Sequence, residues 1–272
     1  MPCRALCFED AAVMLDLTLT NVSLMLLASA GAGLVDAIVG GGGLIIVPSL
    51  FGLFPNAVPA TLLGTNKAAS IWGTGWAALQ YARRVKLPSV RLMGAIVAAM
   101  LGGLLGAWLA TLIPSARFRV ALPWVLAAVW AYTLWRKDLG HHHAPHWSAR
   151  TETLIATVIG GLIGFYDGVF GPGTGSFFVF ALVRLLGWDF LHASAAAKRL
   201  NFATNVAALA WFIPHGHVVW ALALPMAVAN VAGSAVGTHL ALKHGAGFVR
   251  VAFLLVVGAL ILKTGLDAWQ LH

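Results

Sequence analysis

Charged residues are scarce in this sequence. Asp, Glu, Lys and Arg make up 10% of its 272 residues, whereas a soluble domain carries roughly 25% because its surface faces water. So few charges cannot cover the surface of a soluble protein of this size. Hydrophobic residues reach 60%, and apolar stretches long enough to cross a bilayer recur along the chain. The sequence therefore predicts an all-α polytopic protein embedded in a lipid bilayer.

Cysteine is also nearly absent. Cys3 and Cys7 both precede the first apolar segment, and a structural zinc site needs four ligands. The glycine-rich run GGGGLIIVP lacks the lysine and the Ser or Thr of a phosphate-binding loop. ATP-driven transport within this chain is therefore not supported, and we expect no cofactor.

Acidic residues are outnumbered by basic ones, 9 to 17. The basic residues gather in short loops, as in the RRVK run at 83–86, and no aromatic-basic surface accompanies them. This pattern is typical of membrane orientation signals, so we expect no nucleic-acid partner. Four histidines, His141, His142, His143 and His146, cluster in a central loop. Such tracts can bind metals, but this one lies away from the site predicted below, and we assign no metal site.

Ten apolar segments alternate with short loops. Five precede the central loop and five follow it, at about 18–39, 44–54, 60–82, 91–113, 117–136, 152–170, 175–187, 192–213, 218–242 and 248–268. The second and seventh are too short to span a bilayer, since a crossing helix needs about 20 residues. Each follows a glycine cluster, and broken backbone is tolerated at membrane depth only inside protein or along a water-filled cavity. We therefore predict two broken or re-entrant helix pairs.

The chain repeats itself at an offset of 131 residues. This offset relates Asp36 to Asp167, Lys67 to Lys198, Arg119 to Arg250, Gly33 to Gly164, Gly40 to Gly171, Gly42 to Gly173, Gly102 to Gly233 and Gly106 to Gly237. Matching charged residues at one ungapped offset indicate a tandem duplication. We expect an N-terminal repeat at 18–136, a basic, histidine-rich loop at 137–150 and a C-terminal repeat at 151–268.

The orientation of the two repeats follows from their basic loops. Such loops face the cytoplasm, which places both 83–86 and 137–150 on that side. If each broken pair returns to its starting side, each half contributes three crossings and one hairpin. Three is odd, so the halves are expected to be inverted, as in secondary transporters. Five full spans in each half would also give inversion, whereas one long crossing for each broken pair would not.

Two aspartates stand just before the glycine clusters. Asp36 and Asp167 lie inside apolar segments, where an ionisable residue by default indicates a functional site. Because desolvation disfavours the charged form of a carboxyl group, we consider both as proton-coupling residues. The alternative is that each aspartate caps a helix end or bonds the glycine turn.

The glycine clusters suit an anion. A broken helix presents unpaired N–H groups and a positive dipole end, and glycine lets that backbone approach a ligand closely. The substrate-binding candidates here are Gly40, Gly41, Gly42 and Gly43 in the first half and Gly171, Gly173 and Gly175 in the second. For Gly102, Gly103 and Gly106 we favour tight helix crossings instead.

Cations and amides follow each hairpin. Lys67 and Lys198 occupy equivalent positions, and Arg199 adjoins the second. They can neutralise an anion or pair with the aspartates; the alternative is that they extend to the membrane interface. Further substrate-binding candidates are Asn66, Ser70, Asn201 and Asn205, because polar groups at one level of both halves are typical of a cavity lining.

The two signature regions resemble the TauE/SafE (sulfite exporter, or TSUP) family. The run DAIVGGGGL, Pro48 and the GTNK stretch at 64–67 carry the first match, and GFYDGVFGPGTGSFF with AAAKRLNFATN carries the second. The resemblance covers nearly the whole chain. It implies a transporter, with export favoured, of a small sulfur-containing or organic anion in a bacterial inner membrane. The second half departs from the first where Asn66 aligns with Ala197.

Two other functions stay open at this point. A passive anion channel is also compatible with broken helices. A membrane-embedded enzyme would use the two aspartates as acid and base, but no nucleophile–base pair or metal constellation supports it, so no catalytic residue is assigned. A homodimer is compatible with the sequence, which does not define the substrate or the coupling ion.

Overall fold

The computed structural model describes residues 17–87, 89–134 and 147–269, which contain helices and no strand. The cysteines and the histidine cluster of the central loop lie outside these residues. The first half comprises α2 (Leu19–Val39), α3 (Gly43–Leu53), α4 (Pro59–Arg84), α5 (Ser89–Leu112) and α6 (Ser115–Leu134). The second comprises α7 (Ala149–Val169), α8 (Thr174–Leu186), α9 (Phe190–Phe212) and α10 (Trp220–Trp269).

These bounds follow the predicted apolar segments closely. The last two predicted segments form the single element α10, but Gly245 inside it is non-helical, with φ at 73°. Hydroxyl side chains start the first helix of each half: Thr18 accepts from the N–H of Asn21 and Ser148 from that of Thr151. Such caps satisfy N–H groups that a helix start leaves free.

Four described helices are long and apolar enough to cross a membrane: Leu19–Val39, Leu92–Leu112, Ala149–Val169 and Trp220–Gly245. The elements α3 and α8 have 11 and 13 residues, which confirms that the second and seventh segments are too short to span. The elements α4 and α9 have 26 and 23 residues but are more polar, since they carry the lysines, the asparagines and, in α4, two terminal arginines.

The helices of one half pack mainly against helices of the other half. The most extensive contacts join α5 to α7 and α2 to α10, so the partners come from opposite halves. A Cβ added at Gly102 or Gly106 of α5 would collide with the backbone of α7, and one added at Gly233 or Gly237 of α10 would collide with that of α2. The offset of 131 relates these two crossings. The glycines there allow close helix packing, as predicted.

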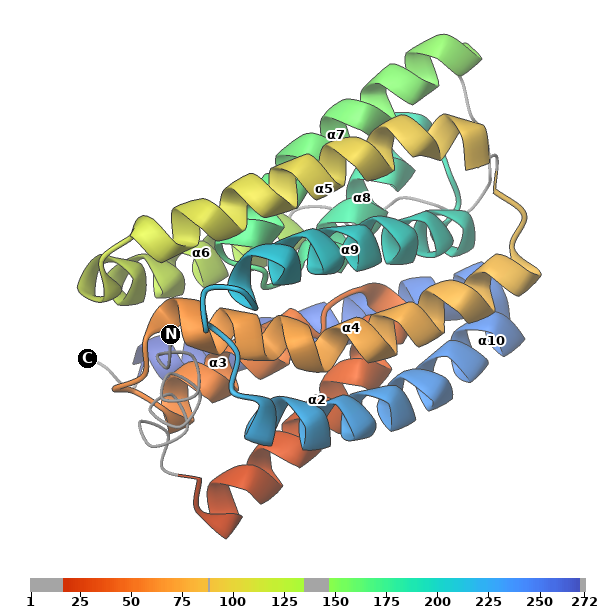
Figure 1. Ribbon diagram of the computed structural model, residues 1–272. Helices are drawn as coiled ribbons and strands as arrows, with labels where there is room; N and C mark the ends of the chain where they lie inside the picture. The colour runs from red at the N-terminus through yellow and green to blue at the C-terminus, as the bar shows by residue number, and fades with distance from the viewer. Residues whose placement is uncertain (1–16, 88, 135–146, 270–272) are drawn as a thin grey trace.

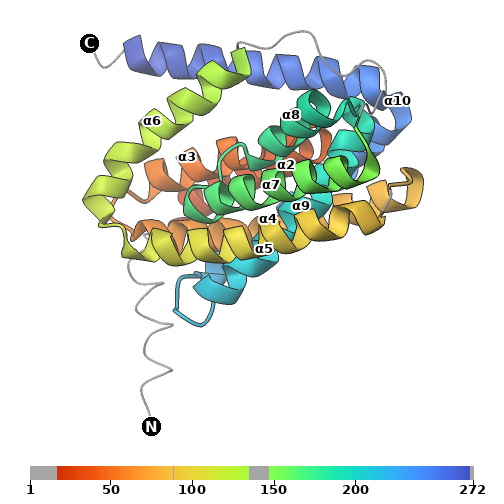
Figure 2. The ribbon, with the colours of Figure 1, turned by 90° about the horizontal axis from the view of Figure 1, so that it is seen from above.

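Equivalent connections lie at opposite ends of the bundle. Figure 1 shows the chain passing from α4 to α5 at the right end and from α9 to α10 at the left end. Figure 2 shows α6 and the C-terminal part of α10 diverging from the bundle, around the other helices. The short helices α3 and α8 lie within it, so both breaks are inside the protein.

Candidate functional site

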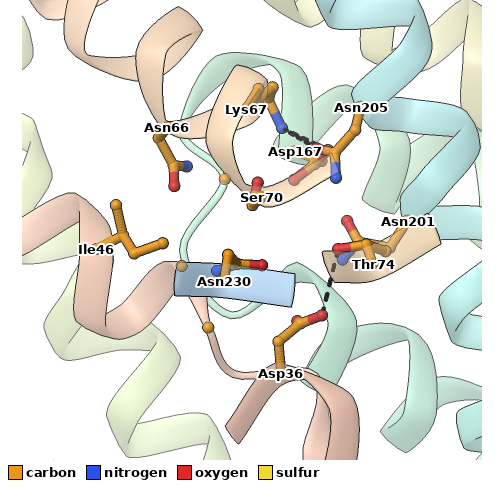
Figure 3. A pocket seen from close by; sticks show the side chains of 13 residues that line it. Asp36, Ile46, Asn66, Lys67, Ser70, Thr74, Asp167, Asn201, Asn205 and Asn230 are labelled. Atoms are coloured by element: carbon orange, nitrogen blue, oxygen red, sulfur yellow. Dashed lines mark hydrogen bonds and ion pairs between the residues drawn. The ribbon is translucent and has the colours of Figure 1, made fainter. Parts of the chain in front are cut away.

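A cavity at the helix breaks brings together residues of both halves (Figure 3). It is lined by Asp36, Gly42, Gly43, Ile46, Asn66, Lys67, Ser70, Thr74, Asp167, Gly171, Asn201, Asn205 and Asn230. Ten of these thirteen were candidates from the sequence. Ile46, Thr74 and Asn230 were not. The duplication therefore places polar residues separated by up to 194 positions around one space.

Lys67 and Asp167 form a buried ion pair between the halves. Lys67 Nζ lies 2.7 Å from Asp167 Oδ2, and the two side chains are 2% and 3% exposed. The ammonium also donates to Asn205 Oδ1 at 3.2 Å. Asp167 Oδ1 accepts from the Thr174 hydroxyl at 2.7 Å. Both charges therefore have additional polar partners, which a buried ion pair needs to offset desolvation.

Lys198 and Asp36 form the second pair, again across the halves. Lys198 Nζ lies 3.1 Å from Asp36 Oδ2 and also donates to the Asp36 backbone carbonyl. The Thr74 hydroxyl donates to Asp36 Oδ2 at 3.3 Å (Figure 3). The Lys198 side chain is 1% exposed, but that of Asp36 is 14% exposed. The carboxylate of this pair is thus the more open of the two.

The two clusters occupy equivalent positions. Each contains an aspartate and the lysine of the other half. The third member is a polar residue that lies seven positions after the lysine of the aspartate's own half. That residue is Thr74 beside Asp36 and Asn205 beside Lys67. Both lysines are buried, so neither extends to the membrane interface. Of the two alternatives, the structure has the one in which the lysines pair with the aspartates.

Glycines shape both breaks. Gly40 ends α2 with φ at 81°, and its N–H donates to the Asp36 carbonyl. Gly171 and Gly173 have φ of 87° and 76°. Since only glycine adopts such angles readily, these three positions favour glycine for conformation alone. Gly175 packs against the backbone of Gly40, so the two breaks are in direct contact.

The N-terminus of α3 lies at the cavity. The N-caps of α3 and α8 are Gly42 and Gly173, neither of which has a capping side chain. Gly42 and Gly43 line the cavity. The first N–H groups of α3 are therefore positioned beside the ion pairs, and a helix N-terminus favours a negative charge.

Asparagine side chains complete the lining. Asn66 is 5% exposed, and among the described residues its Oδ1 has no hydrogen-bond partner. Because burying an unpaired amide is costly, this group is suited to a ligand or water in the cavity. Asn230 of α10 donates to the Ser29 carbonyl at 3.0 Å.

Some candidates lie elsewhere. Gly40, Gly41, Gly173, Gly175, Lys198 and Arg199 do not line the cavity. Lys198 reaches its edge through Asp36, whereas Arg199, its neighbour on α9, is only half-buried and outside the lining.

The missed polar residues had recognisable signals. Thr74 lies seven positions after Lys67, two turns along the same helical face. Asn230 is an amide within an apolar segment. Thr174 contacts Asp167 from the GPGTG run, in which only the glycines were predicted site residues.

Apolar helices surrounding buried charges and a polar cavity define a multi-pass membrane protein built to handle a polar solute. The model of the family described as Sulfite exporter TauE/SafE matches residues 25–264. The chain belongs to this family and is a membrane transporter.

Curated relatives carry matching names. "Probable membrane transporter protein ORF9" of Sinorhizobium is 38% identical over 252 residues, covering 92% of this chain and 94% of that protein. The "Probable membrane transporter protein" of Haemophilus influenzae is 30% identical, with 95% and 100% covered. YfcA of Escherichia coli K12, with the same description, is 34% identical, with 87% of each covered. No solved structure gives a significant match.

Proposed function

We propose that this protein is a secondary transporter of a small anion, coupled to protons through its buried aspartates. The observation that carries the proposal is the pair of aspartate–lysine clusters beside the cavity. Two carboxylates and two ammonium groups sum to zero charge. An added anion therefore needs a compensating charge, and a proton on one aspartate supplies it.

Competition for a lysine links the proton to the anion. An ionised aspartate occupies its partner lysine and repels another anion. When the carboxylate is protonated, the lysine is left with a full positive charge close to the N-terminus of α3 and to cavity amides such as Asn66. These groups bind an oxyanion well. A proton and an anion then cross together.

The arrangement of the helices supports alternating access between inverted halves. The connections α4–α5 and α9–α10 lie at opposite ends of the bundle (Figure 1). The first contains Lys86 and follows Arg83 and Arg84, whereas residues 213–219 of the second contain no Lys or Arg. The positive-inside rule places the first in the cytoplasm and the second outside. Each half then has three crossings plus a broken pair around a central site.

The substrate class comes from the family. Its name specifies sulfite export, and sulfite, thiosulfate and sulfonates all present several oxygens to charged and amide donors. We propose outward transport of an anion of this class down its own concentration gradient, with the proton leaving beside it. The proposed binding residues are Lys198 at the edge of the cavity and the asparagines of the cavity, with Ser70 beside them, while Lys67 lines the same space.

Flux into proteoliposomes tests this function. Purified protein should give saturable uptake of radiolabelled sulfite, thiosulfate or a sulfonate, driven by an imposed proton gradient. Conductance without saturation would identify a channel, and conversion of the solute would identify an enzyme. Absence of flux for every anion of the class would overturn the proposal.

A further inference from the structure

We propose that the two clusters have different roles, with Asp36 exchanging the coupling proton and Lys198 binding the anion, while Lys67 and Asp167 stay paired and position the site. This assignment rests on the proposed function and makes it more specific. The sequence repeat alone gives the two aspartates equivalent positions. In the structure their hydrogen-bond partners and their exposure differ.

Asp167 makes two short contacts. Lys67 and the Thr174 hydroxyl each approach it at 2.7 Å, one on each carboxylate oxygen. Thr174 is itself 2% exposed, and Lys67 is held in addition by Asn205. Protonating this carboxylate would leave the buried Lys67 ammonium without its counter-charge. Such a change is costly inside a protein.

Asp36 has looser partners and more access. Its contacts from Lys198 and Thr74 measure 3.1 and 3.3 Å, and both go to the same oxygen, Oδ2. Its side chain is 14% exposed and lines the cavity. The backbone carbonyl of Asp36 also accepts from Lys198. Lys198 therefore keeps one partner when the carboxylate is neutralised, and a proton can reach that carboxylate from the cavity.

The difference originates in replacements at equivalent positions. Thr174 corresponds to Gly43 at the offset of 131, so Asp36 has no second hydroxyl donor of this kind. Asn205 corresponds to Thr74: the amide oxygen stabilises the Lys67 ammonium, whereas the threonine donates to Asp36 and makes no contact with Lys198. The first replacement adds a contact to Asp167, and the second moves the remaining contact from the carboxylate to the lysine.

The proton step balances in charge. A proton from cavity water binds Asp36 and converts the carboxylate to the neutral acid. The Lys198 ammonium keeps its own proton and pairs with a monoanion, so the cluster remains neutral overall. Release of anion and proton on the other side restores the Asp36–Lys198 pair.

Among the described residues around Asp36, Lys198 is the charged group in contact with it. From α4, Tyr81 donates to the Ala37 carbonyl beside it. On α10, His239 and Lys243 are exposed, as is Arg184 of α8. None of these three exposed groups forms an ion pair with Asp36 among the described residues, so the charged partner of its carboxylate is Lys198.

Proton counting on anion binding tests the assignment. The full chain in detergent is mixed with isethionate, a sulfonate that stays ionised throughout, in weakly buffered solution containing a pH-indicator dye. Wild-type protein should take up one proton for each anion bound, and its affinity should fall by about tenfold per unit of rising pH where Asp36 is ionised. Asp36→Asn should bind without proton uptake and lose this pH dependence.

The second cluster provides the contrast. Thr174→Val should still take up one proton per anion, as should Asp167→Asn if it folds. Lys198→Ala should lose at least tenfold in affinity, whereas Lys243→Ala, which removes an exposed lysine of α10, should bind as wild type. Proton uptake by Asp36→Asn, or binding to the wild type without any uptake, would overturn the assignment. Failure of isethionate, thiosulfate and sulfite alike to bind would reject the proposed function itself.

Discussion

The two helix breaks have the same glycines but different support. At the break between α7 and α8, the Thr174 hydroxyl lies within hydrogen-bond distance of Asp167 Oδ1 and of the Gly171 carbonyl oxygen, at 2.7 and 2.8 Å, and the Tyr166 hydroxyl donates to the Pro172 carbonyl. At the break between α2 and α3, Gly40 makes a backbone bond to Asp36 and Gly42 caps α3 without a side chain. Side chains thus support the second break from within, and the first lacks this support.

The first break depends on the second for its position. The Ser176 N–H donates to the Gly40 carbonyl at 2.9 Å, and the Ser176 hydroxyl donates to the Val39 carbonyl at 3.0 Å. The two halves therefore share the charges and the glycines, whereas the supporting hydrogen bonds are concentrated at the second break. A well-supported second break beside a less constrained first break suits the proposed coupling, because one part can hold the site while the other responds.

The contact between the breaks should be the most sensitive feature. In Gly40→Ala, the new Cβ would collide with the Gly175 backbone, and the positive φ adds about 1–2 kcal/mol. We expect little folded protein by size-exclusion chromatography. Gly216→Ala is the matched control, because Gly216 also has a positive φ but no atom within 4 Å of the added Cβ. Equal yields for the two variants would contradict the contact.

Removing the two carboxylates one at a time should lower the stability of the folded protein by different amounts. Asp167→Asn leaves Lys67 buried without its counter-charge, which costs about 3–5 kcal/mol. Asp36→Asn should cost less, about 1–3 kcal/mol, because Lys198 retains the Asp36 carbonyl and the carboxylate is the more exposed one. Thermal unfolding in detergent should rank the wild type first, Asp36→Asn second and Asp167→Asn last. The reverse order of the two variants would refute the inequality of the clusters.

Substituting Thr174 and Thr74 makes the same comparison with smaller expected losses of stability. Thr174→Val removes a 2.7 Å bond to a buried carboxylate and should cost about 1.5–3 kcal/mol. Thr74→Val removes a 3.3 Å bond and should cost about 0.5–1 kcal/mol. Valine keeps the shape of threonine, so differences in unfolding midpoint report the hydrogen bonds. A larger loss for Thr74→Val would show that the first break is the better supported.

Much of this organisation could be predicted from the sequence. The apolar segments gave the helices, and the offset of 131 identified both aspartates and both lysines. The pairing could not be predicted, because an offset within the chain is equally compatible with Lys67 meeting Asp36 or Asp167. In the folded protein α5 packs on α7 and α10 packs on α2, and in this arrangement Lys67 pairs with Asp167. Thr174 was missed because its hydroxyl bond depends on the turn geometry, and Arg199 was included because its neighbour Lys198 was.

The equivalent connections between helices extend the comparison to pH. Lys86 of the first half corresponds to His217 of the second. His217 lies between α9 and α10, where its ring Nδ1 is 3.2 Å from the Thr61 hydroxyl oxygen. Burial, with a smaller contribution from nearby His215, lowers the pKa of His217 below its ordinary value. The folded protein therefore binds fewer protons here than the unfolded chain once the pH falls through about 6.5.

Stability should consequently decline as the pH falls from about 6.5 towards the lowered pKa of His217. Replacing the imidazole with an amide that does not titrate, in His217→Gln, removes this contribution, so the unfolding midpoint in detergent should depend less on pH across that interval. His239→Gln removes an exposed histidine of α10 and should leave the dependence intact. If both variants keep the wild-type dependence of the unfolding midpoint on pH, His217 does not cause that dependence. The two equivalent connections would then differ only in their basic residues, which set the orientation in the membrane.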